Sequence, residues 1–91
     1  MYSKETTFVR RTDTLNSRIG DEMILMDSVQ GEFLTLNAVA SRAFELLESR
    51  MDFEKLCDLL IDEFEVDPDL CRKEMSEYLE DLVSRKLILV V

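Results

Sequence analysis

The spacing of the hydrophobic positions changes near residue 37. Before that point, short apolar and β-prone runs predict three strands, over residues 6–11, 23–26 and 32–36. After it, apolar residues recur three and four positions apart, which predicts three helices. The order β-β-β-α-α-α predicts an α+β fold in which a three-stranded antiparallel sheet precedes three helices. We expect residues 1–91 to form one domain, because 91 residues leave no room for a second core.

The three expected strands differ in pattern. Residues 23–26 are apolar at every position, which is typical of a middle strand with both faces covered. Residues 32–36 alternate in polarity and should return as the neighbouring strand after a turn. Gly31 is placed to take a left-handed conformation that closes a three-residue hairpin loop. Residues 12–20 are polar and turn-rich, so we expect a loop there.

Polar residues mark where each helix begins. Asn37, Asp52 and Asp67 each precede an amphipathic stretch and can accept hydrogen bonds from its first amides. The first predicted helix runs from residue 38 to about residue 49. The second begins at about residue 53, and the third runs from residue 68 to about residue 86. The apolar tail 87–91 has the composition of a short strand.

In this arrangement the strand 32–36 lies at an edge of the sheet. An edge strand exposes unpaired N–H and C=O groups, to which a partner peptide can add as a further strand. The pattern alone leaves three alternatives: an edge masked by the tail, an edge masked by a second copy of the chain, and an edge open to a peptide.

The composition of the chain disfavours several classes of function. The net charge is −9, and residues 22–91 hold seventeen acidic and seven basic side chains. So acidic a surface repels phosphate and disfavours nucleic acid, although three strands and three helices could otherwise form a winged-helix DNA reader. The N-terminus lacks an apolar segment typical of export and no stretch is long enough to span a bilayer, so we expect a cytoplasmic protein with no membrane partner.

Catalysis is not expected. The chain has no histidine, and Gly20 and Gly31 are its only glycines, so there is no phosphate-binding glycine loop. Its many carboxylates fall on polar helix faces, where solvation explains them better than acid–base chemistry. Cys57 and Cys71 lie on apolar helix stripes, which favours buried free thiols over a disulfide or a metal pair. We therefore predict no enzyme activity, no cofactor and no metal.

One series of segments stands out along the chain: Glu22-Met23-Ile24-Leu25-Met26-Asp27, Gly31-Glu32-Phe33, Leu36-Asn37, Ala40, Ala43-Phe44-Glu45-Leu46-Leu47, Cys71, Glu74-Met75, Tyr78-Leu79, Leu82 and Leu87-Ile88. Their order and spacing resemble the PqqD family of small peptide chaperones, also called recognition elements for ribosomally synthesised and post-translationally modified peptides. The likeness runs from about Phe8 to Val90, with Phe44 where many members have tryptophan and Lys86 where a glycine often ends the third helix.

The resemblance implies a winged-helix-like fold and a non-catalytic chaperone. Its third strand would bind the leader region of a precursor peptide by strand addition, in a groove walled by the third helix. It also implies that the tethered precursor passes to a separate enzyme, such as a radical-SAM maturase or a lasso-type leader protease and cyclase, in PQQ-type, lasso-peptide or related biosynthesis. The peptide-binding residues carried over are Glu32, Phe33, Leu34, Thr35, Leu36, Cys71, Glu74, Met75, Tyr78 and Leu82. A winged-helix nucleic-acid binder and a structural dimerisation module remain the alternatives, so a homodimer is an open prediction.

Overall fold

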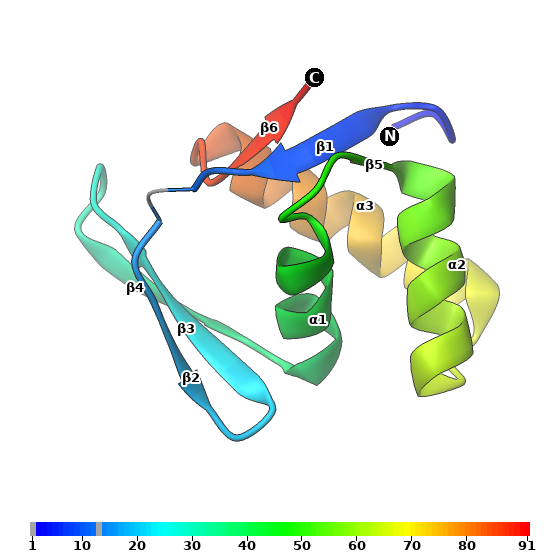
Figure 1. Cartoon of the computed structure of the whole chain (residues 1–91), viewed down its shortest axis with the longest axis horizontal. Helices are drawn as coiled ribbons and strands as arrows, with labels where there is room; N and C mark the ends of the chain where they lie inside the picture. Colours follow the sequence, from blue (N-terminus) through cyan, green and yellow to red (C-terminus); the bar gives the residue numbers. More distant parts are fainter. Residues whose placement is uncertain (1, 13) are drawn as a thin grey trace.

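The computed structural model describes residues 2–12 and 14–91. Two small antiparallel sheets pack with three helices around one core (Figure 1). The prediction of an α+β, winged-helix-like chain with a three-stranded antiparallel sheet before three helices is confirmed. The elements are β1 (Thr7–Arg10), β2 (Asn16–Ile19), β3 (Glu22–Asp27), β4 (Glu32–Leu36), α1 (Ala38–Leu46), β5 (Met51–Asp52), α2 (Phe53–Phe64), α3 (Pro68–Ser84) and β6 (Ile88–Val90).

The first strand of the three-stranded sheet before the helices is not the one expected. That sheet has the order β2-β3-β4, so β3 is its middle strand as predicted, but residues 16–19 take the place assigned to residues 6–11. The prediction of a loop over residues 12–20 is therefore wrong for 16–19, while Asp13 lies outside the described residues. The signal was weak because every residue of β2 is exposed, and a strand with no buried face needs no apolar alternation.

Strand β1 belongs to a second sheet of order β5-β1-β6. Phe8 is buried at its centre and lies opposite Val90, so the apolar tail does form a strand. The C-terminal strand thus pairs with β1, and it does not mask the outer edge of β4.

The helix starts are as predicted. The side chains of Asn37, Asp52 and Asp67 accept hydrogen bonds from the amides of Ala40, Lys55 and Asp69. Helix α1 ends at Leu46, earlier than expected, because the chain must turn to form β5 against β1. Gly31 has a φ of +71°, as predicted, but residues 28–31 make the β3–β4 loop one residue longer than expected.

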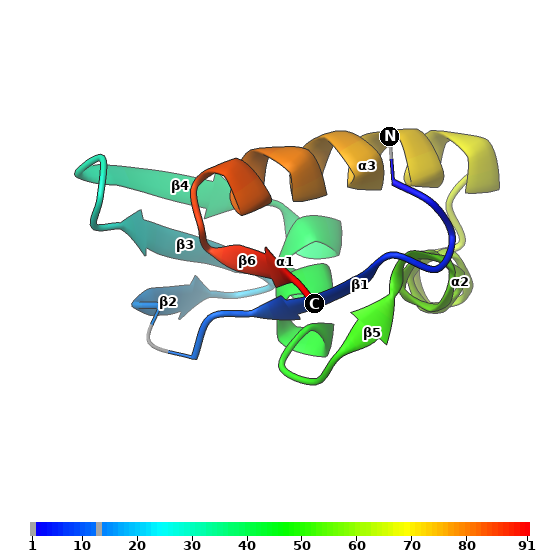
Figure 2. The same cartoon turned by 90° about the horizontal axis from the view of Figure 1, so that it is seen from above.

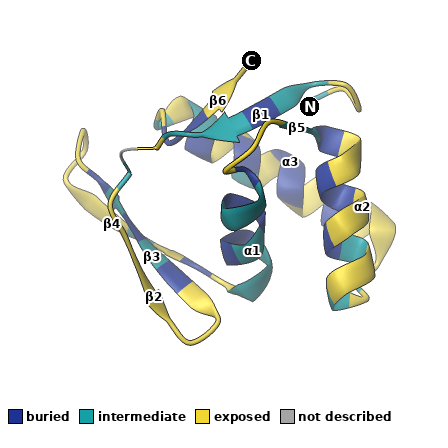
Figure 3. Ribbon diagram, in the orientation of Figure 1, coloured by how far each residue is buried: buried dark blue, intermediate teal, exposed yellow. Residues whose placement is uncertain are grey.

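The core lies between the inner face of β2-β3-β4, the three helices and the second sheet. Buried side chains line the inward faces of all three helices, while β2 and much of β4 are exposed (Figure 3). The two cysteines are buried, as predicted, and neither is part of a disulfide in this structure. Burial raises the pKa of the Cys57 thiol to about 12 and also raises the pKa of Cys71, so both are protonated at neutral pH.

Helix α3 ends in a motif that usually contains glycine. Lys86 has a φ of +61°, its amide donates to Val83 at 3.0 Å, and the amide of Leu87 donates to Leu82 at 2.9 Å. This is the Schellman arrangement, in which a left-handed residue closes the helix. The motif stops α3 even without glycine, at the cost of a strained lysine.

Replacing Lys86 by glycine should therefore stabilise the fold. We expect Lys86→Gly to raise the free energy of unfolding by about 0.5–1 kcal/mol, because glycine adopts positive φ without strain. Lys86→Ala should give no such gain, since alanine keeps the strain. Urea unfolding of the three proteins measures the difference, and an equal gain for alanine would show that the backbone conformation is not its cause.

Candidate functional site

The open edge of β4 is defined by its ladder with β3. The amide of Met26 donates to the carbonyl of Leu15 at 3.0 Å, so the backbone of Met26 points toward β2. Backbone groups alternate in direction along an antiparallel strand, so Asp27, Leu25 and Met23 point toward β4. Their partners there are Glu32, Leu34 and Leu36.

It follows that Phe33 and Thr35 turn their amides and carbonyls away from β3. No strand in the described part of the chain pairs with this side of β4. The same alternation sends their side chains to the outer face of the sheet, away from the helices, and Phe33 is 72% exposed there. Leu34 and Leu36 point to the inner face and pack against the core. The edge therefore offers two donors and two acceptors to an added strand.

Helix α3 runs along the same side of the molecule as β4, while β2 lies at the far edge of the sheet (Figure 2). One side-chain contact joins the C-cap of α3 to the start of β4, and another joins α3 to α1, the helix that follows β4. Nη1 of Arg85 lies 3.2 Å from Oε1 of Glu32, the first residue of β4. The Tyr78 hydroxyl donates to the carbonyl of Ala40 at 3.0 Å, in the first turn of the helix that follows β4. These contacts hold the helix and the open edge at a set separation.

Arg85 is the centre of an ion-pair cluster. Its Nη1 also lies 3.1 Å from Oδ2 of Asp27, which is only 1% exposed, and its Nε lies 3.1 Å from Oδ1 of Asp81. Burial alone would raise the pKa of Asp27. The amides of Gln30 and Val29 and the Arg85 guanidinium outweigh that effect and hold the pKa below its usual value of 3.8. The cluster therefore fixes the β3–β4 turn to the end of α3.

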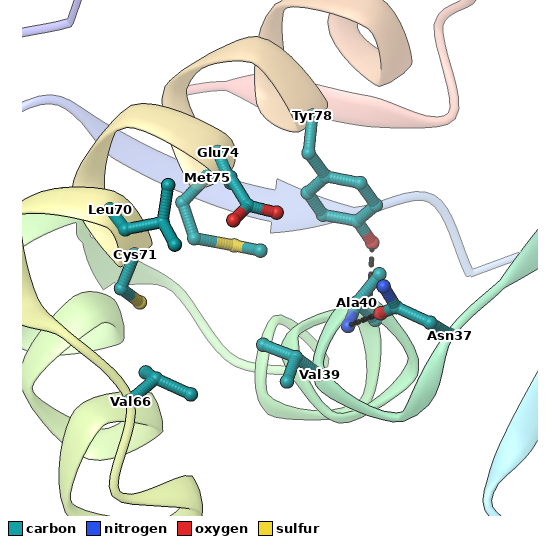
Figure 4. Close-up of a pocket in the computed structure, with 9 residues that line it drawn as sticks. All are labelled: Asn37, Val39, Ala40, Val66, Leu70, Cys71, Glu74, Met75 and Tyr78. Carbon is teal, nitrogen blue, oxygen red and sulfur yellow. Dashed lines mark hydrogen bonds between the residues drawn. The ribbon is translucent and has the colours of Figure 1, made fainter.

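A cavity opens where β4 ends. It has a volume of about 220 Å³ and lies between the start of α1 and the first turns of α3 (Figure 4). Asn37, the residue directly after β4, is on its rim, and Glu74 brings one carboxylate to an otherwise mainly apolar wall. The residues that line it are Asn37, Val39, Ala40, Val66, Leu70, Cys71, Glu74, Met75 and Tyr78. Burial raises the pKa of the Tyr78 hydroxyl, which stays a neutral donor.

The structure brings part of the predicted site together. Cys71, Glu74, Met75 and Tyr78 share the wall of this cavity, whereas Leu82 is 1% exposed in the core and lines no part of it. The five strand residues Glu32, Phe33, Leu34, Thr35 and Leu36 form β4, beside the cavity rather than in it. Whether these ten residues contact a peptide stays a prediction.

The sequence reasoning missed the α1 side of the cavity and the role of Arg85. Val39 and Ala40 fell on an apolar helix stripe, which indicates core packing and nothing more. Val66 and Leu70 flank the cap of α3, and an apolar pair beside a helix start is the sequence signal that could have indicated this side of the cavity. Arg85 carried no signal, since its partner Asp27 is 58 positions away.

The described residues contain no cluster of three or more histidine, cysteine, aspartate or glutamate side chains that could hold a metal ion. Within the same residues, no helix combines the length and the apolar character needed to cross a bilayer. The absence of a cofactor and of enzyme activity stays a prediction.

The fold and the site together define a small winged-helix-like domain with an open sheet edge beside an apolar cavity. The family model of coenzyme PQQ synthesis protein D (PqqD) matches residues 22–88, so the chain belongs to the PqqD family, as the resemblance implied. The solved structure of TbiB1 in complex with the TbiA(beta) leader peptide is similar, with a TM-score of 0.73 and 26% identity. The match covers 88% of this chain and 93% of that one. No curated protein sequence matches the chain.

Proposed function

We infer that this chain is a peptide chaperone that binds the leader region of a ribosomally synthesised precursor and presents it to a separate modifying enzyme. One observation carries the inference: among the residues that the structure describes, none pairs with the outward backbone groups of Phe33 and Thr35 on β4, beside α3 and next to a cavity. Membership of the PqqD family and the likeness to TbiB1, which binds a leader peptide, support it.

We propose that the leader adds to β4 as a fourth strand. Its backbone would then pair with Phe33 and Thr35, in the manner of β-augmentation. Leader side chains opposite Leu34 and Leu36 would point toward α3, because paired residues on neighbouring strands share a face. A leader that continues past Thr35 reaches Asn37 and the cavity, where an apolar side chain can be buried.

The net charge of the chain affects which leader peptides it should bind and which alternative functions are compatible with it. With a net charge of −9, the protein should favour a leader that carries lysine or arginine, and that preference should weaken with salt. The same charge disfavours the winged-helix nucleic-acid binder. The enzyme that receives the precursor would be a radical-SAM maturase or a lasso-type leader protease and cyclase, and the exchange would take place in the cytoplasm.

Tyr78 tests whether the cavity takes part in leader binding. We expect Tyr78→Ala to weaken leader affinity about tenfold, because it removes a wall of the cavity and an apolar contact of about 1.5–3 kcal/mol. Tyr78→Phe keeps the ring and should stay within about threefold of the original. Fluorescence anisotropy with a labelled leader measures both, and circular dichroism should show retained helix.

A matched control lies on the neighbouring helix. Leu59 is partly exposed on α2 and lines no part of this cavity, so Leu59→Ala should leave leader affinity unchanged. If Tyr78→Ala and Leu59→Ala weakened leader binding equally, the cavity would not be part of the leader-binding site.

A further inference from the structure

The outer face of β2-β3-β4 is an exposed apolar surface, and its side chains on β2 and β3 have no part in the proposed leader capture. The registers place Leu15, Ile19, Ile24, Met26 and Phe33 on this face, interspersed with Ser17, Glu22 and Thr35. Leu15 is 70% exposed and Ile19 62% exposed. A shallow hollow of about 310 Å³ lies among Leu15, Ile24, Met26 and Phe33. Apolar surface of this extent on one face marks an interaction site.

The charge of this face separates it from the rest of the molecule. Charged residues make up 34% of the chain, but among the eight described residues of the face only Glu22 is charged. Depletion of charge at the centre is the compositional mark of a protein–protein interface. Asp21 and Glu22 lie exposed at one end of the face, and neither forms an ion pair within the described residues.

We propose that this outer face, defined by Leu15, Ile19, Ile24, Met26 and Phe33, is the docking site for the modifying enzyme. The matching surface of the enzyme would be apolar and edged by lysine or arginine. The proposal rests on the proposed function, since the enzyme is the one that receives the leader. Two copies of a chain with a net charge of −9 repel each other, so charge favours a neutral or basic partner over a second copy.

The outer face is continuous with the strand to which the leader adds, and this continuity explains why the enzyme would dock there. Phe33 and Thr35 carry the free edge groups and also belong to the outer face. Leader residues that pair with them would therefore point to the same face and extend it. An enzyme on this face contacts the chaperone and the outward side chains of the leader together, so it distinguishes loaded chaperone from empty.

The test uses a variant on the strand farthest from the leader. Leu15→Thr/Ile19→Thr removes apolar surface from β2 and from the residue just before it, keeps β-prone residues there, and leaves β4 untouched. The probe is the purified modifying enzyme encoded with the precursor, titrated onto chaperone saturated with leader peptide and, separately, onto empty chaperone. Leu59→Gln on α2 is the control, because it removes a partly exposed leucine elsewhere.

We expect the double variant to weaken enzyme binding at least tenfold while leader affinity changes less than twofold. Wild-type chaperone should bind the enzyme more tightly when loaded, and Leu59→Gln should match wild type. Glu22→Lys should weaken enzyme binding at low salt, with a smaller difference at high salt. Enzyme affinity unchanged by Leu15→Thr/Ile19→Thr would overturn the proposal, as would a dimer of the wild-type chain that this variant dissociates. Leader binding is measured in its own titration, so a failure of leader capture is distinguished from a failure of enzyme docking.

Discussion

Thr35→Pro should weaken leader binding by at least about tenfold. The amide of Thr35 faces away from β3, so proline removes an edge donor without breaking the β3–β4 ladder. A lost backbone hydrogen bond costs about 0.5–1.5 kcal/mol, and the proline ring also displaces the neighbouring part of the added strand. Isothermal titration calorimetry with the leader peptide measures the change, with melting curves to show that the variant remains folded.

Two further variants isolate the edge amide as the cause. Thr35→Val keeps the amide and removes only the hydroxyl, so it should bind the leader like wild type. Asn16→Pro makes the same backbone change at the opposite edge of the sheet, where the alternation turns the amide of Asn16 away from β3. It should leave leader affinity intact. If Asn16→Pro and Thr35→Pro weakened binding equally, the choice of the β4 edge would be wrong.

Arg85→Met should cause a large loss of stability, a fall in melting temperature of roughly 10 °C. The substitution leaves the buried Asp27 carboxylate without its guanidinium partner, while the amides of Val29 and Gln30 still donate to it. Glu32→Gln changes an exposed member of the same cluster and should shift the melting temperature by far less. Thermal unfolding followed by circular dichroism compares the three proteins.

The pH dependence of that loss follows from the pKa of Asp27. Because the folded pKa lies below the usual 3.8, ionised Asp27 stabilises the fold above that value, and the contribution disappears as pH falls through the folded pKa. Without Arg85 the folded pKa rises, so the acid loss of stability should begin at higher pH in Arg85→Met. Identical acid midpoints for the two proteins would contradict this role.

The helices and the central hairpin could be predicted because their signals are local. Caps such as Asn37 and Asp67 act on amides two or three positions away, and the apolar stripe of α2 repeats within one helix. Strand β2 escaped prediction because it buries no face and depends on backbone pairing with β3. Strand β1 was recognised, but its partner β6 lies at the other end of the chain, and no local pattern encodes that choice.

The same distinction between local and long-range signals applies to the candidate site. The edge position of β4 followed from the apolar pattern of residues 23–26, which placed that strand in the middle of the sheet, and the α3 wall of the cavity followed from the family resemblance. The opposite wall needed the packing of α1 on α3, which places Val39 and Ala40 near Met75 and Tyr78. Leu82 was also carried over from the family resemblance, and its side chain lies in the core outside the lining of the cavity.

Hydrogen exchange at single amides tests the central claim most directly. With ¹⁵N-labelled protein, the amides of Phe33 and Thr35 should exchange rapidly in the free chain, because they face solvent at the edge, and slowly once the leader is bound. Those of Leu34 and Leu36 should be protected in both states, and those of Asn16 and Arg18 on the β2 edge should not change. Protection that appears at Asn16 and Arg18, or leader binding that leaves Phe33 and Thr35 exchanging as before, would contradict strand addition to β4.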